Sequence, residues 1–580
     1  MKKVNYNKNT SNQTKKLVLI LSAAMLVAYV LIVGVSNIFG GGSDVELITE
    51  KPDDSVEQGY VRHENQENRT DDFYENLDII KSDNGVRYGV ATSNPIASEV
   101  GMKVLEDGGN AVDAAVALSY ALNVTDPQNS GLGGGGGMLI YDTSTGEKEF
   151  YDYYISSGDA DPVANIGIPG FIKGLEQATQ DYGTKSYGDL IQYAIDLGEQ
   201  GIEVTEGYAQ ILAQYNYIAQ VHPSFTKDGN LLQAGDMLFQ PELMETFKAI
   251  RDGGSDVFYG GQSEISKNFL NLTGISPESL AAYTVNKSKP IEATYRGYDI
   301  ISANGPFSGS TVLQGLLLEE QLDIPQHDLQ NPDYNIVMKN LLKFISREGW
   351  RLNADPKFAQ IDVESALDIN QLLKNYQESI GDETYIDEPE TESTTAFSVI
   401  DKNGMIVSVT NTISNYWGSY SIRDGIIYNN AMKNFSNSAN NKFDYNKRPK
   451  TGIAPVIITN QEGHLEALGS NGGANIPTYL LNYIINTKKY DMNSQQANDL
   501  ERVYYRKGLM HFETDAPYVV SGDRINFDEQ YVTRRTSTAW GLMNGLEFKA
   551  DGQMIGHSDN RNYFGHGAIF SNGTERFTNE

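Results

Sequence analysis

Apolar and small polar residues alternate on both sides of Asn403-Gly404, through the run 394–412. Such alternation is typical of half-buried β-strands, and Asn-Gly is the dipeptide that best fits a two-residue type I′ turn. The pattern therefore predicts a β-hairpin. With the turn at Asn403-Gly404, position i faces position 807 − i, so Thr412 lies opposite Thr395 and beside Thr394. Two hydroxyl groups are expected together at one end of the hairpin.

Elsewhere, helical patterns alternate with short strand-like runs, and no internal repeat is visible. Asn110 is suited to cap a helix. The residues that recur after it at helical spacing, which we interpret as core packing, are Val112, Ala115, Val116, Ser119 and Leu122. Short strands are predicted at 138–141 and at 451–458.

The N-terminal part of the chain has a different pattern. Five lysines precede Leu17 to Phe39, an uncharged stretch long enough to cross a bilayer as one helix. A cleaved signal peptide would have a shorter apolar core and an Ala-x-Ala site, and a buried core helix is the other alternative. We predict a cytoplasmic tail at 1–16, a signal anchor at 17–39, and a solvated acidic stalk at 40–84. The protein would then be a single-pass membrane protein with an external C-terminal domain.

Composition excludes several classes of function. The 580 residues carry a formal net charge of −31, which argues against a nucleic-acid partner because phosphate binding needs a basic face. The chain has no Cys, so disulfides, a catalytic thiol, thiolate metal sites and a lipoprotein anchor are excluded. The seven histidines are scattered without metal-ligand spacing, and no metal or organic cofactor is predicted.

The glycine run 133–137 raises the question of a phosphate loop. No Lys-Ser or Lys-Thr follows it, and the next residues, 138–141, are strand-like. A nucleotide site is therefore not predicted. Because glycine lacks a Cβ atom, we interpret the run as backbone that passes close to a reaction centre or turns tightly.

Several motifs follow one another in the order found in the γ-glutamyltranspeptidase family. They are residues 91–101, 108–115, 130–137, 306–309, 394–412 and 469–473. Agreement among spaced motifs is far more specific than any single motif. From about Tyr88 to the C-terminus, the chain resembles this family.

The resemblance implies an α+β fold of the N-terminal-nucleophile hydrolase type, in which two antiparallel sheets are stacked between helical layers. It also implies self-cleavage between Ser393 and Thr394, with the fragments 85–393 and 394–580 remaining associated. The acidic segment 365–392 is typical of an exposed stretch that leads to a cleavage point.

The chemistry of Thr394 can be argued from its position. A Thr hydroxyl is a weak nucleophile near neutral pH and needs a base beside it. An N-terminal amine, with a pKa of about 7.7 to 8, is a better base at working pH than a Lys with a pKa of about 10.4. That amine exists only after cleavage of the Ser393–Thr394 bond. Attack of the Thr394 hydroxyl on the preceding carbonyl would therefore create the base and free the nucleophile together.

The family resemblance also implies roles for three further residues. Thr412 would orient the Thr394 hydroxyl, although a cross-strand Thr pair that only stabilises the hairpin is the alternative. The backbone N–H groups of Gly472 and Gly473 would form an oxyanion hole, for which a plain turn is the alternative. These residues and Thr394 are the predicted catalytic set.

Two stretches, 410–418 and 448–455, look closer to the capsule poly-γ-glutamate depolymerase branch of this family, called CapD-type, than to glutathione hydrolases. The predicted substrate-binding residues are Ser414, Asn434, Thr451, Gly452 and Tyr154. Asn434 stands where ordinary members have an Asp that meets the α-ammonium group of a small γ-glutamyl donor. Interior residues of a γ-linked polymer have no free amine, and a buried, unpaired carboxylate would be costly.

Two other positions depart from the family pattern. Tyr154 stands where the family has an Arg that holds the substrate carboxylate, and a phenol cannot replace a bidentate guanidinium. Another cation, Arg423, Arg448 or Lys450, would have to take that role, or the polymer differs from plain poly-γ-glutamate. Ala396 replaces the usual His two places after the nucleophile.

Three hypotheses remain open. The first is an enzyme at the bacterial cell surface that cuts a γ-glutamyl capsule polymer and passes it to water or to a cell-wall amine. The second is a glutathione-type γ-glutamyltransferase, which would favour Asp at 434 and Arg at 154. The third is a non-catalytic surface protein, suggested by Tyr154 and Ala396 but opposed by the retained Thr394.

Overall fold

The computed structural model describes residues 80–81, 85–380, 393–506, 508–513, 531–533, 541–559, 561–562 and 564–578. All of them belong to one compact unit, Tyr60–Glu580. The predicted tail, the membrane anchor at 17–39 and nearly all of the stalk lie outside the described residues. Among the helices that are described, none has both the length and the apolar character needed to cross a membrane.

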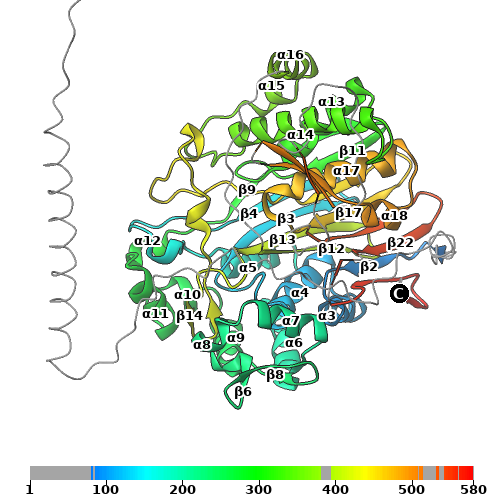
Figure 1. Cartoon of the computed structure of the whole chain (residues 1–580). Helices are drawn as coiled ribbons and strands as arrows, with labels where there is room; N and C mark the ends of the chain where they lie inside the picture. The colour runs from blue at the N-terminus through cyan, green and yellow to red at the C-terminus, as the bar shows by residue number, and fades with distance from the viewer. Residues whose placement is uncertain are drawn as a thin grey trace, which may run out of the picture. The chain divides into compact units, whose positions relative to one another are not determined.

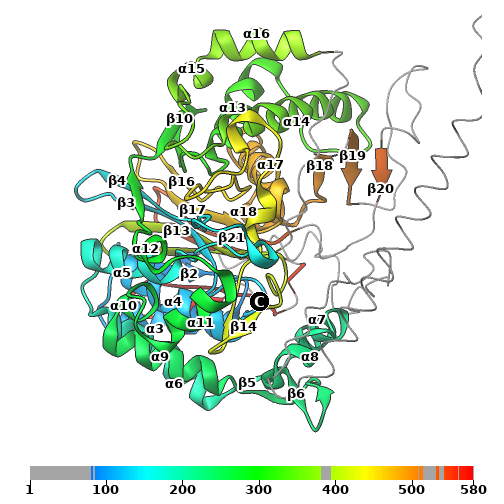
Figure 2. The same cartoon turned by 90° about the vertical axis from the view of Figure 1, so that its left-hand side faces the viewer.

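Two large sheets form the centre of the molecule, and neighbouring strands within each are antiparallel (Figures 1 and 2). The eight-stranded sheet has the order β24 (Arg576–Thr578), β23 (Ala568–Ser571), β2 (Tyr88–Ala91), β12 (Ser393–Ile400), β13 (Met405–Ser414), β3 (Gly135–Asp142), β4 (Glu147–Tyr153), β9 (Asn286–Ser288). The seven-stranded sheet has the order β1 (Ile80–Lys81), β22 (Gln553–Ser558), β21 (Met543–Phe548), β17 (Leu465–Ser470), β16 (Val456–Thr459), β11 (Tyr298–Ser302), β10 (Ile291–Tyr295).

Helices cover the outer face of each sheet (Figure 1). The eight-stranded sheet contacts α3 (Pro95–Glu106), α4 (Ala111–Thr125) and α5 (Phe171–Tyr182), with α6 (Tyr187–Gln200) behind them. The seven-stranded sheet contacts α13 (Gly309–Leu322) and α17 (Ile476–Lys489), with α14 (Pro332–Leu352) behind them. Three apolar clusters fill the three interfaces between these layers. The predicted arrangement of two sheets between helical layers is therefore confirmed.

Shorter elements connect and flank these layers. They are α7 (Glu206–Gln214), α8 (Ile218–Val221), α9 (Pro241–Gly253), α10 (Asp256–Tyr259), α11 (Glu264–Thr273), α12 (Pro277–Ala281), α15 (Val363–Leu367), α16 (Ile369–Ser379), α18 (Ser494–Asp499) and the strand pairs β5 (Ile202–Glu203) with β8 (Met237–Leu238), β6 (Thr226–Lys227) with β7 (Asn230–Leu231), and β14 (Ile422–Arg423) with β15 (Ile426–Ile427). A small sheet of β18 (Val503–Arg506), β19 (Leu509–Phe512) and β20 (Tyr531–Thr533) lies beside α14 (Figure 2).

The predicted helix after Asn110 is α4, and it lies directly under the strands of the hairpin. The Asn110 side chain accepts a hydrogen bond from the Asp113 N–H, and the Asp113 carboxylate accepts one from the Asn110 N–H, both at 2.9 Å. This reciprocal pair satisfies two donors at the start of the helix. Every residue of α4 is buried, because the sheet lies on one side and other helices on the other.

The predicted hairpin forms, but its register differs by one residue. Ile400 pairs with Ile406 and Thr395 with Asn411, so position i faces 806 − i. The cause is the turn, in which the Gly404 N–H donates to the Asp401 carbonyl while Gly404 has a φ of 85°. The connection is therefore a three-residue loop ending in a left-handed glycine, not a two-residue type I′ turn.

Two other strand predictions can be compared with the structure. Residues 138–141 lie within β3, as predicted. The strand predicted at 451–458 is wrong in its first half, because β16 begins at Val456 and residues 451–455 form irregular backbone that contributes to the pocket described below. Within the glycine run, a Cβ atom on Gly134 would overlap the Thr412 carbonyl oxygen. The interpretation of the run as closely approaching backbone is confirmed.

Candidate active site

Two threonine hydroxyls meet at the carbonyl oxygen of Ser393, the carbonyl of the predicted cleavage bond. The Thr394 hydroxyl donates to that oxygen at 2.6 Å, and the Thr412 hydroxyl donates to the same oxygen. Both side chains are buried. The predicted nucleophile and a second hydroxyl donor therefore lie against the carbonyl group that the predicted self-cleavage would attack.

A β-bulge in the hairpin lies at this convergence. Ser393 pairs with Ser414 and Thr395 pairs with Asn411, so Thr412 and its neighbour Ile413 oppose the single residue Thr394. Beyond the bulge, Ser414 has a φ of 85°, and its N–H donates to the Thr412 hydroxyl oxygen at 2.8 Å. That hydrogen bond turns the Thr412 proton toward Ser393, since a hydroxyl that accepts from one side donates to the other.

The loop after α4 holds the residues on either side of Thr394. The Ser393 hydroxyl contacts the carbonyl oxygens of Gln128 and Asn129 at 3.0 and 2.9 Å. The Thr395 hydroxyl donates to the Asp126 carboxylate at 3.0 Å. Burial raises the pKa of Asp126 to about 7, and hydrogen bonds from Asn129, Thr395 and Gln128 only partly oppose it. Sequence reasoning missed Asp126, although it lies only four positions before the motif at 130–137.

The predicted substrate residues gather around Asn434. Its amide nitrogen donates to the Tyr154 hydroxyl at 3.2 Å and to the Ser414 hydroxyl at 3.4 Å. Its side-chain oxygen is buried and has no hydrogen-bond partner among the described residues. Burial raises the pKa of Tyr154 to about 12, so this phenol stays neutral and serves as a hydrogen-bonding group.

Asn434 also lines a pocket with Thr451 and Gly452, the two remaining predicted substrate residues. The rest of the lining comes from α13, α14, α17, β18 and the loops beside them: Ser308, Thr311, Ile345, Ser346, Gly349, Asn353, Lys450, Ala474, Asn475, Pro477, Thr478 and Tyr505. All five predicted substrate residues are therefore linked to one region by hydrogen bonds or a shared pocket wall.

Gly472 and Gly473 form the turn between β17 and α17, directly before the pocket residues Ala474 and Asn475. Their φ angles are 121° and 60°, values that favour glycine. A Cβ atom on Gly452 would overlap the Gly473 carbonyl oxygen, so the two loops are in close contact. The turn thus borders the same pocket as Asn434.

The three cations considered as substitutes for the missing Arg differ in position. Arg448 is buried in an ion pair with Asp152 at 3.2 Å, and its guanidinium also donates to the carbonyl oxygens of Tyr154 and Thr284. Arg423 lies exposed on β14. Lys450 is buried in the pocket wall. Of the three, only Lys450 lines the pocket that contains Asn434.

One group of potential metal ligands lies in the described residues, on the seven-stranded sheet. His464, Glu466 and Glu547 place one ligand atom each within 4.8 Å of one another. The ammonium group of Lys488 already pairs with Glu466 at 2.5 Å and with Glu547 at 3.3 Å. We interpret the group as a buried ion-pair network that keeps its own cation.

The family can now be identified, because the family model described as Gamma-glutamyltranspeptidase matches residues 97–567. The chain belongs to the γ-glutamyltranspeptidase family. This range contains every predicted catalytic and substrate residue, and the resemblance inferred from the sequence is confirmed.

Individual relatives within the family are consistent with this result. The chain is 34% identical over 399 residues to the capsule biosynthesis protein CapD proenzyme of Bacillus anthracis, covering 68% of this chain and 74% of that protein. It is 31% identical over 489 residues to the glutathione hydrolase proenzyme of Bacillus subtilis, covering 75% of this chain and 82% of that protein. The chain therefore has relatives of both the capsule and the glutathione hydrolase kind.

A solved structure confirms the fold. The cephalosporin acylase from Bacillus halodurans superimposes with a TM-score of 0.72 over 85% of this chain and 96% of that chain. The identity is 20%, so this likeness concerns the fold alone. Among γ-glutamyltranspeptidase relatives, the word proenzyme in the names above is consistent with processing into two subunits.

Proposed function

We propose that this protein is a self-processing γ-glutamyl hydrolase and transpeptidase that acts on a γ-linked polyglutamate polymer at the bacterial cell surface. The observation that carries the proposal is the convergence of the Thr394 and Thr412 hydroxyls on the Ser393 carbonyl oxygen. A threonine pair that only stabilised the hairpin would not need to meet at a main-chain carbonyl, and Ser414 links Thr412 by hydrogen bonds to the pocket residue Asn434.

Self-cleavage follows from this arrangement. The Thr394 oxygen attacks the Ser393 carbonyl carbon, and the Thr412 hydroxyl stabilises the negative charge that develops on the carbonyl oxygen. Collapse of the intermediate breaks the C–N bond, protonates the new Thr394 amine and leaves an ester between Ser393 and the Thr394 oxygen. Water hydrolyses this ester. The products are a carboxylate at Ser393 and a free amine and hydroxyl at Thr394.

Turnover repeats this chemistry on a substrate amide. The Thr394 amine removes the proton from its own hydroxyl, which attacks the γ-carbonyl carbon of a glutamyl unit. The N–H groups of Gly472 and Gly473 hold the oxyanion, and the leaving amine takes up the proton. Water or an acceptor amine, such as a cell-wall amine, then releases the acyl group from Thr394.

Asn434 supports a polymer as substrate. Each interior unit of a γ-linked chain has an amide N–H at its α-carbon, and the unpartnered Asn434 oxygen is an acceptor for such a donor. An Asp at this place would bring a buried carboxylate that the amide could not neutralise. The similarity to a capsule biosynthesis protein points in the same direction.

Lys450 is the proposed partner for the substrate α-carboxylate. It lines the Asn434 pocket, and an ammonium group supplies charge without the fixed geometry of a guanidinium. The predicted anchor at 17–39 would keep the enzyme beside a polymer made at the cell surface.

A glutathione-type activity is the second candidate, because the glutathione hydrolase of Bacillus subtilis covers a larger share of this chain than the capsule protein does. The two functions require different contacts with the γ-glutamyl substrate. A glutathione-type enzyme needs a partner for a free α-ammonium group, whereas Asn434 supplies only neutral groups.

The test uses a soluble chain that begins near Asn84. After incubation at neutral pH, intact mass and N-terminal sequencing should reveal a fragment that starts at Thr394. The processed enzyme should shorten poly-γ-glutamate with a higher kcat/KM than it shows for γ-glutamyl anilide. A faster reaction with the anilide would favour the glutathione-type function, and a folded chain that neither cleaves itself nor turns over either substrate would favour a non-catalytic surface protein.

A further inference from the structure

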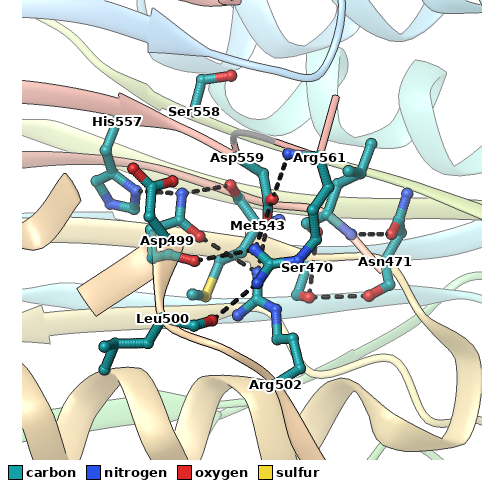
Figure 3. A network of polar contacts seen from close by, with 12 residues as sticks. Ser470, Asn471, Asp499, Leu500, Arg502, Met543, His557, Ser558, Asp559 and Arg561 are labelled. Atoms are coloured by element: carbon teal, nitrogen blue, oxygen red, sulfur yellow. Dashed lines mark hydrogen bonds and ion pairs between the residues drawn. The ribbon is translucent and has the colours of Figure 1, made fainter. Parts of the chain in front are cut away.

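A cluster of four charged residues lies at the end of β22. We call it the Asp559 cluster: Arg502, Glu513 and Asp559, which are buried, and Arg561, which is partly buried. The Asp559 carboxylate accepts hydrogen bonds from both guanidinium groups, from Arg502 at one oxygen and from Arg561 at the other, the latter at 3.0 Å. Arg561 is held in turn by Glu513 at 2.6 Å and by the Leu500 carbonyl oxygen at 2.8 Å. Figure 3 shows the two arginines meeting Asp559 between β22 and the segment after α18.

Hydrogen bonds connect this cluster with the Gly472–Gly473 turn. The carboxylate oxygen of Asp559 that meets Arg502 also accepts from the Met543 N–H at 3.0 Å. The preceding residue, Leu542, is paired twice with Asn471: the Asn471 N–H donates to the Leu542 carbonyl at 2.8 Å, and the Leu542 N–H donates to the Asn471 side-chain oxygen. Asn471 is the residue before Gly472, and Figure 3 shows it beside Ser470.

The contact between these strands leaves little room for adjustment. A Cβ atom on Gly541 would overlap the Asn471 carbonyl oxygen, and the Ser470 hydroxyl contacts the Leu542 carbonyl at 3.2 Å. A shift of Met543 would therefore move Leu542 and, through it, Asn471. A close-packed protein interior transmits such displacements to neighbouring residues.

Stability alone gives a poor account of the Asp559 cluster. Replacing a buried ion-pair network with apolar side chains is often neutral or stabilising, because desolvation cancels much of the attraction. Burial would raise the pKa of Asp559, but Arg561 and Arg502 outweigh it and hold that pKa below its usual value. The carboxylate is thus kept charged, and its orientation is fixed by one guanidinium group at each oxygen.

We propose that Asp559 is a positioning residue for substrate turnover, which holds the Gly472–Gly473 turn in place through Met543, Leu542 and Asn471. The inference rests on the proposed function above, in which that turn supplies the oxyanion hole. Asp559 does not touch the substrate. It fixes the backbone donors, and a displacement of such donors by about 1 Å costs on the order of 100-fold in rate.

The same geometry separates turnover from self-cleavage. In the uncleaved chain the Ser393 carbonyl oxygen already accepts from Thr394 and Thr412, and no hydrogen bond to it from the turn occurs among the described residues. Self-cleavage should therefore be insensitive to Asp559. This difference provides a readout that a general loss of stability would not reproduce.

The variant to make is Asp559→Asn, in which an amide NH₂ group must face the Met543 N–H or a guanidinium. Its matched control is Glu547→Gln, which removes one buried carboxylate charge from the neighbouring ion-pair network on the same sheet. We expect Asp559→Asn to cleave itself at the wild-type rate and to turn over γ-glutamyl anilide with a kcat lower by about 10- to 100-fold and a KM within about twofold. Glu547→Gln should match the wild type in all three quantities.

A second measurement addresses the oxyanion hole directly. A boronic acid analogue of glutamate forms a tetrahedral adduct with the Thr394 oxygen, which places a charged oxygen in the hole. Asp559→Asn should weaken this inhibitor by the same factor as kcat and leave the binding of glutamate unchanged. If Asp559→Asn yields no soluble protein, Asn471→Ala breaks the next link and carries the same expectation.

Several outcomes would overturn the inference. These are loss of self-cleavage in Asp559→Asn, equal losses of kcat in Asp559→Asn and Glu547→Gln, or a rise in KM with an unchanged kcat. Failure of the proposed function would look different, because the wild-type chain would then turn over neither the anilide nor the polymer.

Discussion

Thr394 and Thr412 direct their hydroxyl groups to one atom, the carbonyl oxygen of Ser393. Thr394 is the proposed attacking residue, and Thr412 is an independent donor fixed by the Ser414 N–H. In the uncut chain both hydroxyls therefore already contact the carbonyl group of the proposed cleavage bond. Because the bond and both hydroxyls are buried, bulk water cannot compete for these hydrogen bonds.

Replacement of Thr394 should abolish both processing and turnover. Thr394→Ala removes the attacking oxygen, so the purified chain should remain uncut and its activity should fall by more than about 1,000-fold. Thr394→Ser keeps a hydroxyl and should still cleave itself. Intact mass measured after several days of incubation decides this, and the appearance of the two normal fragments from Thr394→Ala would refute the proposed mechanism.

Thr412 should affect the rate of processing more than folding. Thr412→Val keeps the shape of the side chain but removes the donor to Ser393, and we expect self-cleavage to slow by about 100-fold. The control is Thr412→Ser, which retains the hydroxyl. Time courses on denaturing gels give the rates, and urea unfolding should change by no more than about 2 kcal/mol. A Thr412→Val chain that is cleaved as fast as the wild type would reduce Thr412 to a structural hairpin residue.

The hairpin shows how far the sequence could be interpreted. Alternation around Asn403-Gly404 is enough to predict two paired strands, and it did so correctly. It does not determine the length of the turn, because Asn-Gly fits both a two-residue and a three-residue loop. The choice is made by Asp401, whose carboxylate accepts from the Asn403 and Met405 N–H groups. Thr412 reaches Thr394 because the observed register, in which position i faces 806 − i, places it opposite that residue, and the bulge then adds Ile413 before Ser414 pairs with Ser393.

The surroundings of the site were beyond sequence reasoning for a different reason. The Asp126–Thr395 and Tyr154–Asn434 contacts join residues 269 and 280 positions apart. A single sequence contains no local pattern that pairs such residues. The family resemblance supplied the substrate residues but no role for Asp126 or Asp559, which differ from other acidic residues only through the groups that the fold brings to them.

The role of Asn434 can be tested by restoring a charge. The Tyr154 and Ser414 hydroxyls, which accept from the Asn434 amide nitrogen, could donate to an Asp at 434 instead, and its carboxylate would attract the α-ammonium group of a small γ-glutamyl substrate. We expect Asn434→Asp to change the ratio of kcat/KM for γ-glutamyl anilide to that for polymer by about 10- to 100-fold in favour of the anilide. An unchanged ratio would mean that position 434 does not select the substrate.

Lys450 is expected to be the cation that binds the substrate carboxylate. Loss of a charge-assisted hydrogen bond costs about 1.5 to 3 kcal/mol, so Lys450→Gln should raise the KM for polymer by about 10-fold or more with a smaller effect on kcat. Lys450→Arg should retain most of the affinity. Arg423→Gln is the control, since Arg423 is exposed on β14. An equal rise in KM for Arg423→Gln would indicate a general electrostatic effect and not a contact in the pocket.

Asp126 should make the stability of the uncut chain depend on pH. Its pKa is about 7 in the folded protein because of burial, against about 3.9 in an unfolded chain. Between these values the folded state holds a proton that the unfolded state has lost, so the contribution of Asp126 to the free energy of unfolding falls as pH rises from about 4 to 7, by about 4 kcal/mol in total.

The variant Asp126→Asn cannot lose a proton. In the Thr394→Ala background, this change should therefore be more favourable to stability at pH 8 than at pH 5, as measured by urea unfolding. Asp196→Asn, at an exposed position on α6, is the control and should have the same effect at both pH values. If Asp126→Asn also has the same effect at both, then Asp126 is charged throughout this range in the folded protein.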